Sequence, residues 1–404
     1  MKNGGNSVYS YVINLQCPKC NKTYEKQREQ HLCVCGSPLL VQYDLDRVKT
    51  EWSKEQLLQE PLSLWRYHPL LPVEHPSQVV TMGEGMTPLL PMEQYGAEIG
   101  LSRLLMKDDG LLPTGSFKAR GAAVGVSMAK ALNITELAMP TNGNAGAAWA
   151  QYSARAGIKT HIIMPLDAPE ITRKEVVAAG GNLSLIDGVI SDAGKVVAQK
   201  VKQEGFYDVS TLKEPYRIEG KKTMGLELCE QLNWELPDVI LYPTGGGVGL
   251  IGIYKAIQEL FQIGWVKGEM PRLVAVQAEG CAPIVDAFHA GASESVFHEG
   301  SETAAFGINV PKAIGDFLVL NALYQSKGCA IAISDETLLE EQKRVAQLEG
   351  TFLCPEGAAT FAAAKELARQ SWIQPDETVV CLNTGMGIKY PESIDVHAEE
   401  VAKV

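Results

Sequence analysis

Lys118 lies in the first of four glycine-containing loops whose residue types suit chemistry on a small ligand. The loop reads PTGSFKARG over residues 113–121, and Lys118 falls at the start of a helix expected over 117–132. A cation in the first turn of a helix opposes the helix dipole, so this position favours a neutral amine. A lysine with a lowered pKa can form an imine with a carbonyl compound. The alternative is a solvated lysine beside a turn.

The other three loops also follow expected strands. The loop TNGNAG (141–146) presents Asn144 and exposed amides at a helix start, which suits a carboxylate or a polar ring substituent, although an Asn-Gly turn with a cap reads the same way. In PTGGGVG (243–249), successive backbone N–H groups can converge on a phosphate. The hydroxyl of Thr384 in CLNTGMG (381–387) could bond an unprotonated ring nitrogen or could simply belong to a turn.

Taken together, the four loops describe one ligand, pyridoxal phosphate, which has an aldehyde, a phosphate and polar ring positions. A competing interpretation comes from GVGLIG (247–252), which matches the G-x-G-x-x-G dinucleotide fingerprint, with Glu279 at the end of the next strand. A dehydrogenase would leave Lys118 and Asn144 without a role. The sequence has no G-x-S-x-G or H-E-x-x-H motif, and GKKT (220–223) lacks the upstream glycine of a P-loop.

Alternating strands and helices from residue 101 onward must position these loops. Strands separated by single helices pair in parallel with right-handed crossovers, so the expected class is α/β with an open parallel sheet. Ligands of such sheets bind beyond the carboxyl ends of the strands, where the strand order switches. The expected strands are 104–107, 136–139, 160–164, 183–186, 238–242, 272–278 and 379–382, and the expected helices are 51–60, 117–132, 145–156, 171–179, 192–203 and 250–261.

The composition excludes several classes of partner. The chain has 404 residues, a formal net charge of -12 and a pI of about 5.2, which argues against nucleic acid and against an anionic membrane surface. The longest apolar run, 239–254, is interrupted by Pro243 and several glycines, so it is too short to span a bilayer. The N-terminus lacks the apolar core of a secretory signal. The nine cysteines then indicate reduced thiols in a cytoplasmic protein.

Two close cysteine pairs near the N-terminus predict a zinc ribbon. A C-x-x-C pair is followed after twelve residues by a C-x-C pair, and the four thiols belong to Cys17, Cys20, Cys33 and Cys35. Four thiolates leave no open coordination position, so the expected zinc is structural. The C-x-C pair is tighter than usual, and the alternatives are a ribbon that has lost its metal or four reduced thiols in a loop.

Residues 60–390 resemble fold-type II pyridoxal-phosphate enzymes, and specifically threonine synthases. The motifs WRY (65–67), GEGMTPL (83–89), PTGSFK (113–118) and PYRIEGKKT (215–223) occur in that family's order. The resemblance implies a tryptophan synthase β-like fold with two open parallel-sheet domains and a small N-terminal zinc-ribbon-like unit. The expected division is a ribbon unit at 1–45, a larger cofactor-binding domain at 46–120 and 208–404, and a smaller mobile domain at 121–207.

The resemblance also implies roles for the loop residues. Lys118 would carry the cofactor as a Schiff base and then shuttle protons, Asn144 would contact O3′, and Thr384 would bond the pyridine nitrogen. The cofactor phosphate would be held by Gly245, Gly246, Gly247, Val248 and Gly249. The sequence departs from the family's usual residues at several positions, which are Ala119 in place of Asp, Asn142 in place of Ser, and Gly246 and Gly249 in place of Asn.

The implied activity is that of a threonine synthase, which converts O-phosphohomoserine and water to threonine and phosphate, and the implied assembly is a homodimer. A phosphorylated substrate requires charge-assisted bonds, and about two of six cations are expected to supply them: Arg120, Arg173, Lys174, Arg217, Lys221 and Lys222. The alternatives are a serine or threonine dehydratase, a related β-replacing lyase, or an inactive ligand-binding relative. Lys118 argues against the last, since such a protein could lose it.

Overall fold

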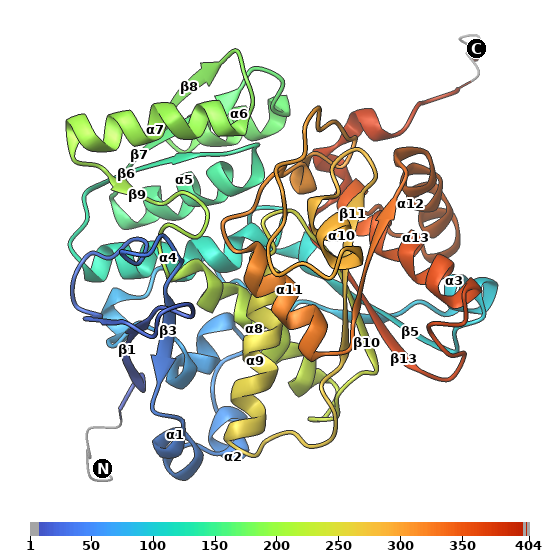
Figure 1. Cartoon of the computed structure of the whole chain (residues 1–404), viewed down its shortest axis with the longest axis horizontal. Helices are drawn as coiled ribbons and strands as arrows, with labels where there is room; N and C mark the ends of the chain where they lie inside the picture. The colour runs from blue at the N-terminus through green and yellow to red at the C-terminus, as the bar shows by residue number, and fades with distance from the viewer. Residues whose placement is uncertain (1–7, 399–400, 402–404) are drawn as a thin grey trace.

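The computed structural model describes residues 8–398 and 401, and its strands form three separate sheets (Figure 1). Residues 1–7, 399–400 and 402–404 lie outside the described residues. The first residues of the predicted ribbon unit, which are also the start of the N-terminal segment expected to lack a signal, are therefore not described. The same holds for the last residues of the predicted larger domain.

The largest sheet has six strands in the order β12-β11-β10-β13-β5-β4, and all its pairings are parallel except the edge pair β4–β5. The chain moves outward from β10 to β12 and then returns to insert β13 between β10 and β5, so the strand order switches beside β10. A ligand site is expected at the carboxyl ends of these strands. The strands are β4 (Leu89–Pro91), β5 (Arg103–Asp108), β10 (Val239–Pro243), β11 (Arg272–Ala278), β12 (Cys329–Ile333) and β13 (Thr378–Asn383).

Both faces of this sheet are buried, which explains why its strands are apolar throughout. Val239 and Leu241 of β10 belong to one hydrophobic core, whereas Ile240 and Tyr242 point to the opposite face and belong to another. Helices α3 (Glu93–Ile99), α12 (Asp335–Glu349) and α13 (Pro355–Arg369) pack on the first face. The helices of the second face are α8 (Arg217–Gln231), α9 (Val248–Gln262), α10 (Pro283–His289) and α11 (Asp316–Gln325).

The second sheet has four parallel strands in the order β8-β7-β6-β9. Helix α4 (Lys118–Ala131) packs on both α5 and α8, so it joins this sheet to the larger one. Helix α7 covers the opposite face of the smaller sheet in Figure 1, against Ala138 and Ile163. The elements are β6 (Glu136–Pro140), β7 (Lys159–Pro165), β8 (Asn182–Ile186), β9 (Tyr207–Asp208), α5 (Asn144–Ala156), α6 (Glu170–Ala178) and α7 (Ile190–Glu204).

The N-terminal unit is a small antiparallel sheet of β1 (Val12–Gln16), β2 (Thr23–Tyr24) and β3 (Leu40–Tyr43). The helix predicted over 51–60 is wrong, because α1 (Leu45–Glu51) precedes it and α2 covers only Lys54–Leu57. Trp52 is extended, and Ser53 forms a capping box with Gln56 that starts a new helix. The proline-rich connector that follows carries two short 3-10 helices, η1 (Leu64–Leu70) and η2 (Pro76–Gln78).

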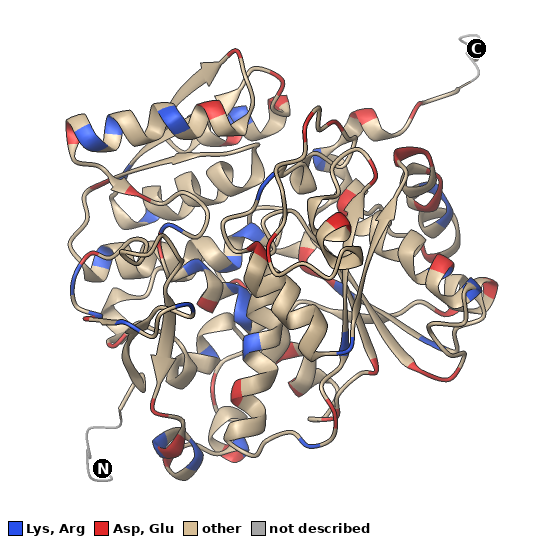
Figure 2. Ribbon diagram, in the orientation of Figure 1, with Lys and Arg blue, Asp and Glu red and all other residues tan. Residues whose placement is uncertain are grey.

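The other predicted strands and helices occur within a few residues of their predicted positions. The elements that were not predicted are β1–β4, β9, β12, α1, α3, α8 and α10–α13. Acidic and basic residues are interspersed along the outer helices in Figure 2. Across residues 8–398 and 401, no helix combines the length and apolarity that a bilayer crossing requires.

Candidate active site

The four predicted loops meet at one cavity of about 590 Å³. The loops after β5, β10 and β13 reach it from the larger sheet, and the loop after β6 reaches it from the smaller sheet. Lys118, Asn144, Thr384 and the run 245–249 all line the cavity, so the structure brings together every residue predicted to hold the cofactor. The four predicted metal ligands lie elsewhere, in the N-terminal unit.

Lys118 is the first residue of α4, and no side chain caps this helix end. Burial, and next the charge of Arg217, lower the pKa of the Lys118 amine to about 8, against the opposing effect of Glu356. The amine lies 4.5 Å from the centre of the Phe117 ring. A substantial neutral fraction near neutral pH is what a nucleophilic lysine requires.

Two glycines allow α4 and α8 to cross closely behind Lys118. A Cβ at Gly220 would lie 2.0 Å from the carbonyl oxygen of Arg120, and a Cβ at Gly121 would lie 3.2 Å from Arg217 Cβ. This crossing brings the first turn of α8, with Arg217 and Lys221, to the cavity wall. Burial, and then the charge of Lys118, hold the pKa of Lys221 well below its ordinary value.

The glycine run after β10 forms the start of α9 and has no room for side chains at two positions. Gly247 adopts a left-handed conformation with a φ of 72°, and a Cβ there would lie 2.1 Å from Val319 Cγ2. A Cβ at Gly249 would lie 2.0 Å from the Tyr242 hydroxyl oxygen. With no side-chain cap, the backbone N–H groups at this helix start are available to an anion.

Asn144 and Thr384 present polar groups to the same cavity. Asn144 Nδ2 donates to the Tyr390 hydroxyl at 2.7 Å, whereas its Oδ1 is buried without a partner among the described residues. The Thr384 hydroxyl lies 3.7 Å from Cys354 Sγ. A buried amine, a cradle of N–H groups, an unpaired carbonyl oxygen and a hydroxyl match the groups of pyridoxal phosphate, so the residues present fit this cofactor.

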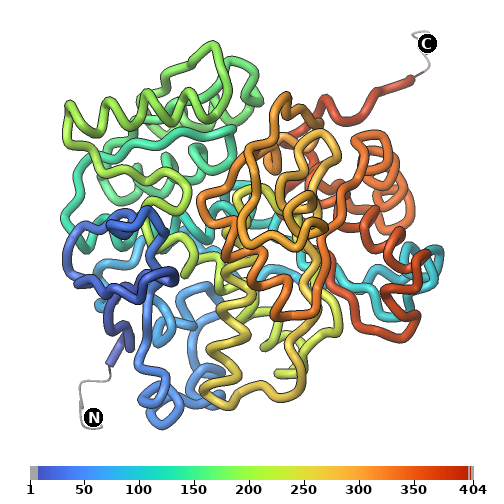
Figure 3. Tube along the Cα trace, in the orientation of Figure 1, coloured from blue at the N-terminus to red at the C-terminus, as the bar shows by residue number. Residues whose placement is uncertain are grey.

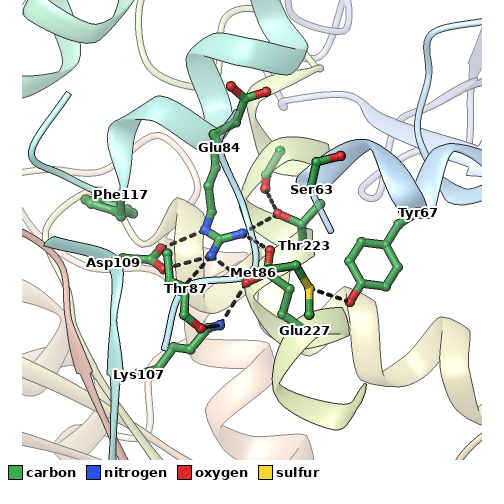
Figure 4. Close-up of polar contacts among 12 residues, drawn as sticks. Ser63, Tyr67, Glu84, Met86, Thr87, Lys107, Asp109, Phe117, Thr223 and Glu227 are labelled. Carbon is green, nitrogen blue, oxygen red and sulfur yellow. Dashed lines mark hydrogen bonds and ion pairs between the residues drawn. The ribbon is translucent and has the colours of Figure 1, made fainter. Parts of the chain in front are cut away.

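Two of the six cations considered for a substrate phosphate, Arg217 and Lys221, line the cavity. Arg120 is instead buried in a network with Asp109, Thr223 and Glu227, whose side chains converge in Figure 4. Lys222 is buried against Glu219 and Glu259, Lys174 pairs with Glu170 at the surface, and Arg173 does not line the cavity.

Several cavity residues were not predicted from the sequence. They are Lys195 on α7, Lys213 before α8, Lys312 in the segment between α10 and α11, Glu356 at the start of α13, and Tyr390. Only Tyr390 had a local signal, because it follows Thr384 by six residues in the same loop region. Glu279, which the dinucleotide alternative required, does not line the cavity.

The four cysteines of the N-terminal unit form a compact cluster in which all Sγ atoms lie within 4.8 Å of one another. The Sγ–Sγ distances are 3.5 Å for Cys17–Cys35 and for Cys20–Cys33. Tetrahedral zinc with Zn–S bonds of about 2.3 Å separates its sulfur ligands by roughly 3.8 Å, so this arrangement fits a zinc ion. The backbone N–H of Cys20 points at Cys17 Sγ at 3.4 Å, which favours a thiolate.

The cysteine unit contacts both the region around α11 and the smaller sheet. Lys19, between two of the cysteines, pairs with Glu294 and lies 4.3 Å from the centre of the Phe317 ring. On the other side, the ring of His31 packs against Tyr207 of β9 at 5.2 Å between centroids. In Figure 3, the blue N-terminal trace runs beside the green segment that contains β9, which Figure 1 labels.

The fold and the site define a fold-type II pyridoxal-phosphate enzyme. Residues 80–385 match the model of the family described as "Pyridoxal-phosphate dependent enzyme". The chain is 35% identical over 390 residues to threonine synthase of Methanocaldococcus jannaschii, with 96% of each protein covered, and 36% identical over 393 residues to that of Methanosarcina acetivorans, with 96% of this chain and 95% of the relative covered. The chain therefore belongs to the threonine synthase family of pyridoxal-phosphate-dependent enzymes.

Solved structures with the same fold include amino-acid enzymes of other activities. Maize serine racemase aligns with a TM-score of 0.65 and 22% identity over 74% of this chain and 88% of its own. Threonine deaminase isoform 2 of Solanum lycopersicum aligns with a TM-score of 0.65 and 19% identity over 84% of this chain and 93% of its own. At these identities the likeness shows the fold alone, and it confirms the predicted fold class.

Proposed function

We propose that this enzyme is a threonine synthase that converts O-phosphohomoserine and water to threonine and phosphate. The observation that carries the proposal is a second group of basic residues in the cavity. Besides the glycine cradle at the start of α9, Arg217 and Lys221 line the wall next to Lys118. A substrate with its own phosphate requires such a region, whereas serine and threonine do not.

Arg217 is held in place for binding an anion. Its guanidinium donates to Glu214 Oε1, to the carbonyl oxygen of Val209 and, at 3.2 Å, to the hydroxyl of Thr211. Lys221 donates to the carbonyl oxygen of Phe117, directly beside Lys118. A dianion bound here would favour the charged form of Lys221, which burial disfavours without it.

Pyridoxal phosphate supplies the electron sink when bound. Lys118 lines the same cavity, where burial lowers the pKa of its amine, so it is placed to transfer protons. The neutral amine can accept the proton from the α-carbon of the amino acid and return it later. Arg217 and Lys221 stabilise the phosphate as its negative charge increases during departure from the γ-carbon.

We further propose that residues 121–207 act as a smaller domain that closes over the substrate. Two contacts support this division. Asn142 Nδ2 donates to the carbonyl oxygen of Asn309 at 3.1 Å, and Lys389 Nζ pairs with Glu175 at 2.8 Å. Both contacts join loops and helices of the smaller sheet to the part of the chain that carries the larger sheet, one between β11 and β12 and the other after β13. Closure excludes water until the phosphate has left, and it retains the reacting amino acid.

The deciding experiment measures phosphate release and amino-acid products from O-phosphohomoserine with the cofactor-saturated enzyme. Equal amounts of phosphate and threonine are expected, and Lys118→Ala should abolish both. Arg217→Gln should raise KM for O-phosphohomoserine by about tenfold or more, because a charge-assisted bond is lost. Ammonia release from serine or threonine without any phosphate release from O-phosphohomoserine would instead assign the dehydratase activity.

We also propose that the enzyme is a homodimer in the cytoplasm. The family resemblance supports a homodimer, which light scattering of the purified protein would test. The nine cysteines, each free among the described residues, support a reducing cytoplasmic location, which fractionation of the producing cell would test.

A further inference from the structure

Glu356 is the one acidic side chain among the described residues that line the cavity, and the proposed mechanism gives it no role. It is the second residue of α13, where the helix dipole stabilises a carboxylate, and it is only 3% exposed. Oε1 accepts the backbone N–H of Gly307 at 2.6 Å. Oε2 is buried without a hydrogen-bond partner among the described residues. A buried carboxylate with one oxygen lacking a hydrogen bond destabilises the folded protein, so the groups around Glu356 are the place to look for its role.

The first set of contacts leads from Glu356 to the smaller sheet through the segment Phe306–Ile308 (η4). A Cβ at Gly307 would lie 2.5 Å from Glu356 Oε1, so only glycine allows this close approach. Two residues further on, the carbonyl oxygen of Asn309 accepts Asn142 Nδ2 at 3.1 Å. The segment therefore lies between Glu356 on one side and the 141–146 loop on the other.

The second set of contacts leads to the same loop through Tyr390. This buried hydroxyl accepts Asn144 Nδ2 at 2.7 Å, so its own proton must point elsewhere. Burial raises the pKa of Tyr390 well above its ordinary value, and the charge of Glu356 raises it further. The carboxylate of Glu356 therefore lies close enough to act on the Tyr390 hydroxyl, and its unpaired Oε2 is available as an acceptor for the Tyr390 proton.

We propose that Glu356 is a positioning residue that fixes both partners of the 141–146 loop, Asn309 and Tyr390, and thereby sets the orientation of Asn144 and the closure of the cavity. Glu356 binds Gly307, two residues before Asn309, and its charge acts on Tyr390, so it lies next to both contacts that the loop makes across the cavity. The effect on turnover rests on the proposed function, whereas the effect on the loop does not.

The test compares Glu356→Ala and Glu356→Gln with the parent enzyme, all with cofactor bound, by hydrogen–deuterium exchange of peptides that cover 141–146 and 306–309. Glu356→Ala should speed exchange in both segments by roughly tenfold or more, since it removes a charge-assisted hydrogen bond and the Tyr390 acceptor. Glu356→Gln keeps an oxygen for the Gly307 N–H, so it should spare 306–309 and loosen 141–146 less. Glu366→Gln, on the same helix but paired with Arg369 at the surface, is the matched control and should change neither segment.

Kinetics provide the second measurement. Glu356→Ala should raise KM more than it lowers kcat, and Tyr390→Phe combined with Glu356→Gln should add little to either single change, because both act on one contact. Unchanged exchange of 141–146 in folded Glu356→Ala would overturn the proposal; if that variant does not fold, unchanged exchange of 141–146 in Glu356→Gln decides against it. Failure of the parent enzyme to release phosphate from O-phosphohomoserine would contradict the proposed function and leave the exchange comparison intact.

Discussion

The lowered pKa of Lys118 leads to a prediction that does not depend on the identity of the substrate. The cofactor-free protein should attach pyridoxal phosphate at a rate that follows the neutral fraction of the Lys118 amine, because only the neutral amine attacks an aldehyde. The rate should rise about tenfold per pH unit below pH 8 and level off above it, since the pKa is lowered to about 8.

The size of the effect follows from the same value. At pH 7 a pKa of about 8 leaves roughly one amine in ten neutral, whereas an ordinary lysine pKa of about 10.4 leaves roughly one in 2,500. Attachment at pH 7 should therefore be on the order of 200-fold faster than for an ordinary lysine of equal access. Arg217→Gln should move the midpoint upward, because the Arg217 charge is one cause of the lowering.

Stopped-flow absorbance of the attached cofactor, from about pH 6 to about pH 10, measures this dependence. Lys118→Ala is the control and should show no attachment. A rate that is still rising tenfold per unit at about pH 9.5 would refute the reasoning, since it would mean that Lys118 titrates as an exposed lysine does.

Three further predictions concern other parts of the chain. Gly247→Ala should lower the free energy of unfolding by about 2–4 kcal/mol, because the backbone there is left-handed and the added Cβ would clash with Val319. Gly246→Ala is the control and should change it by less than ~1 kcal/mol. Urea unfolding of the cofactor-free proteins measures both. Native mass spectrometry should find about one zinc per chain, and Cys33→Ser should lose it. Lys389→Met should lower the free energy of unfolding by about 1–2 kcal/mol, which urea unfolding measures. Adding Glu175→Gln should lower it little further, since both substitutions break the same partly buried ion pair.

The cofactor loops could be predicted because each carries its signal locally. Gly247 and Lys118 are recognisable from short motifs, and the alternation of strands and helices requires the loops to lie at the carboxyl ends of a parallel sheet. The rule on strand order then predicts that loops far apart in the sequence meet. Lys118 and Thr384 are separated by more than half the chain, yet their loops line one cavity.

The rest of the site depends on contacts that no local pattern encodes. Lys213 and Lys312 look like ordinary surface lysines in the sequence, and only packing of the segments before α8 and before α11 brings them to the cavity. For Arg120 the sequence suggested a role that the structure does not support, because its position near Lys118 made it a candidate for binding the substrate phosphate. Its side chain is instead buried in the core, where Asp109 and Glu227 neutralise it. Glu356 had no sequence signal, since its helix was not predicted.

The contacts of the cysteine unit have a consequence for the order in which the chain acquires its structure. Lys19 meets Glu294 across 275 positions of sequence, and Gln30 meets Tyr207 across 177. At about 5–20 residues per second, Lys19 is synthesised roughly 15–55 s before its partner exists. The four thiols, by contrast, all lie within Cys17–Cys35, so a zinc ion can be captured soon after they leave the ribosome. The cysteine unit would then be folded around its metal before the segments that it contacts have been synthesised, and its docking onto them would be among the last steps of folding.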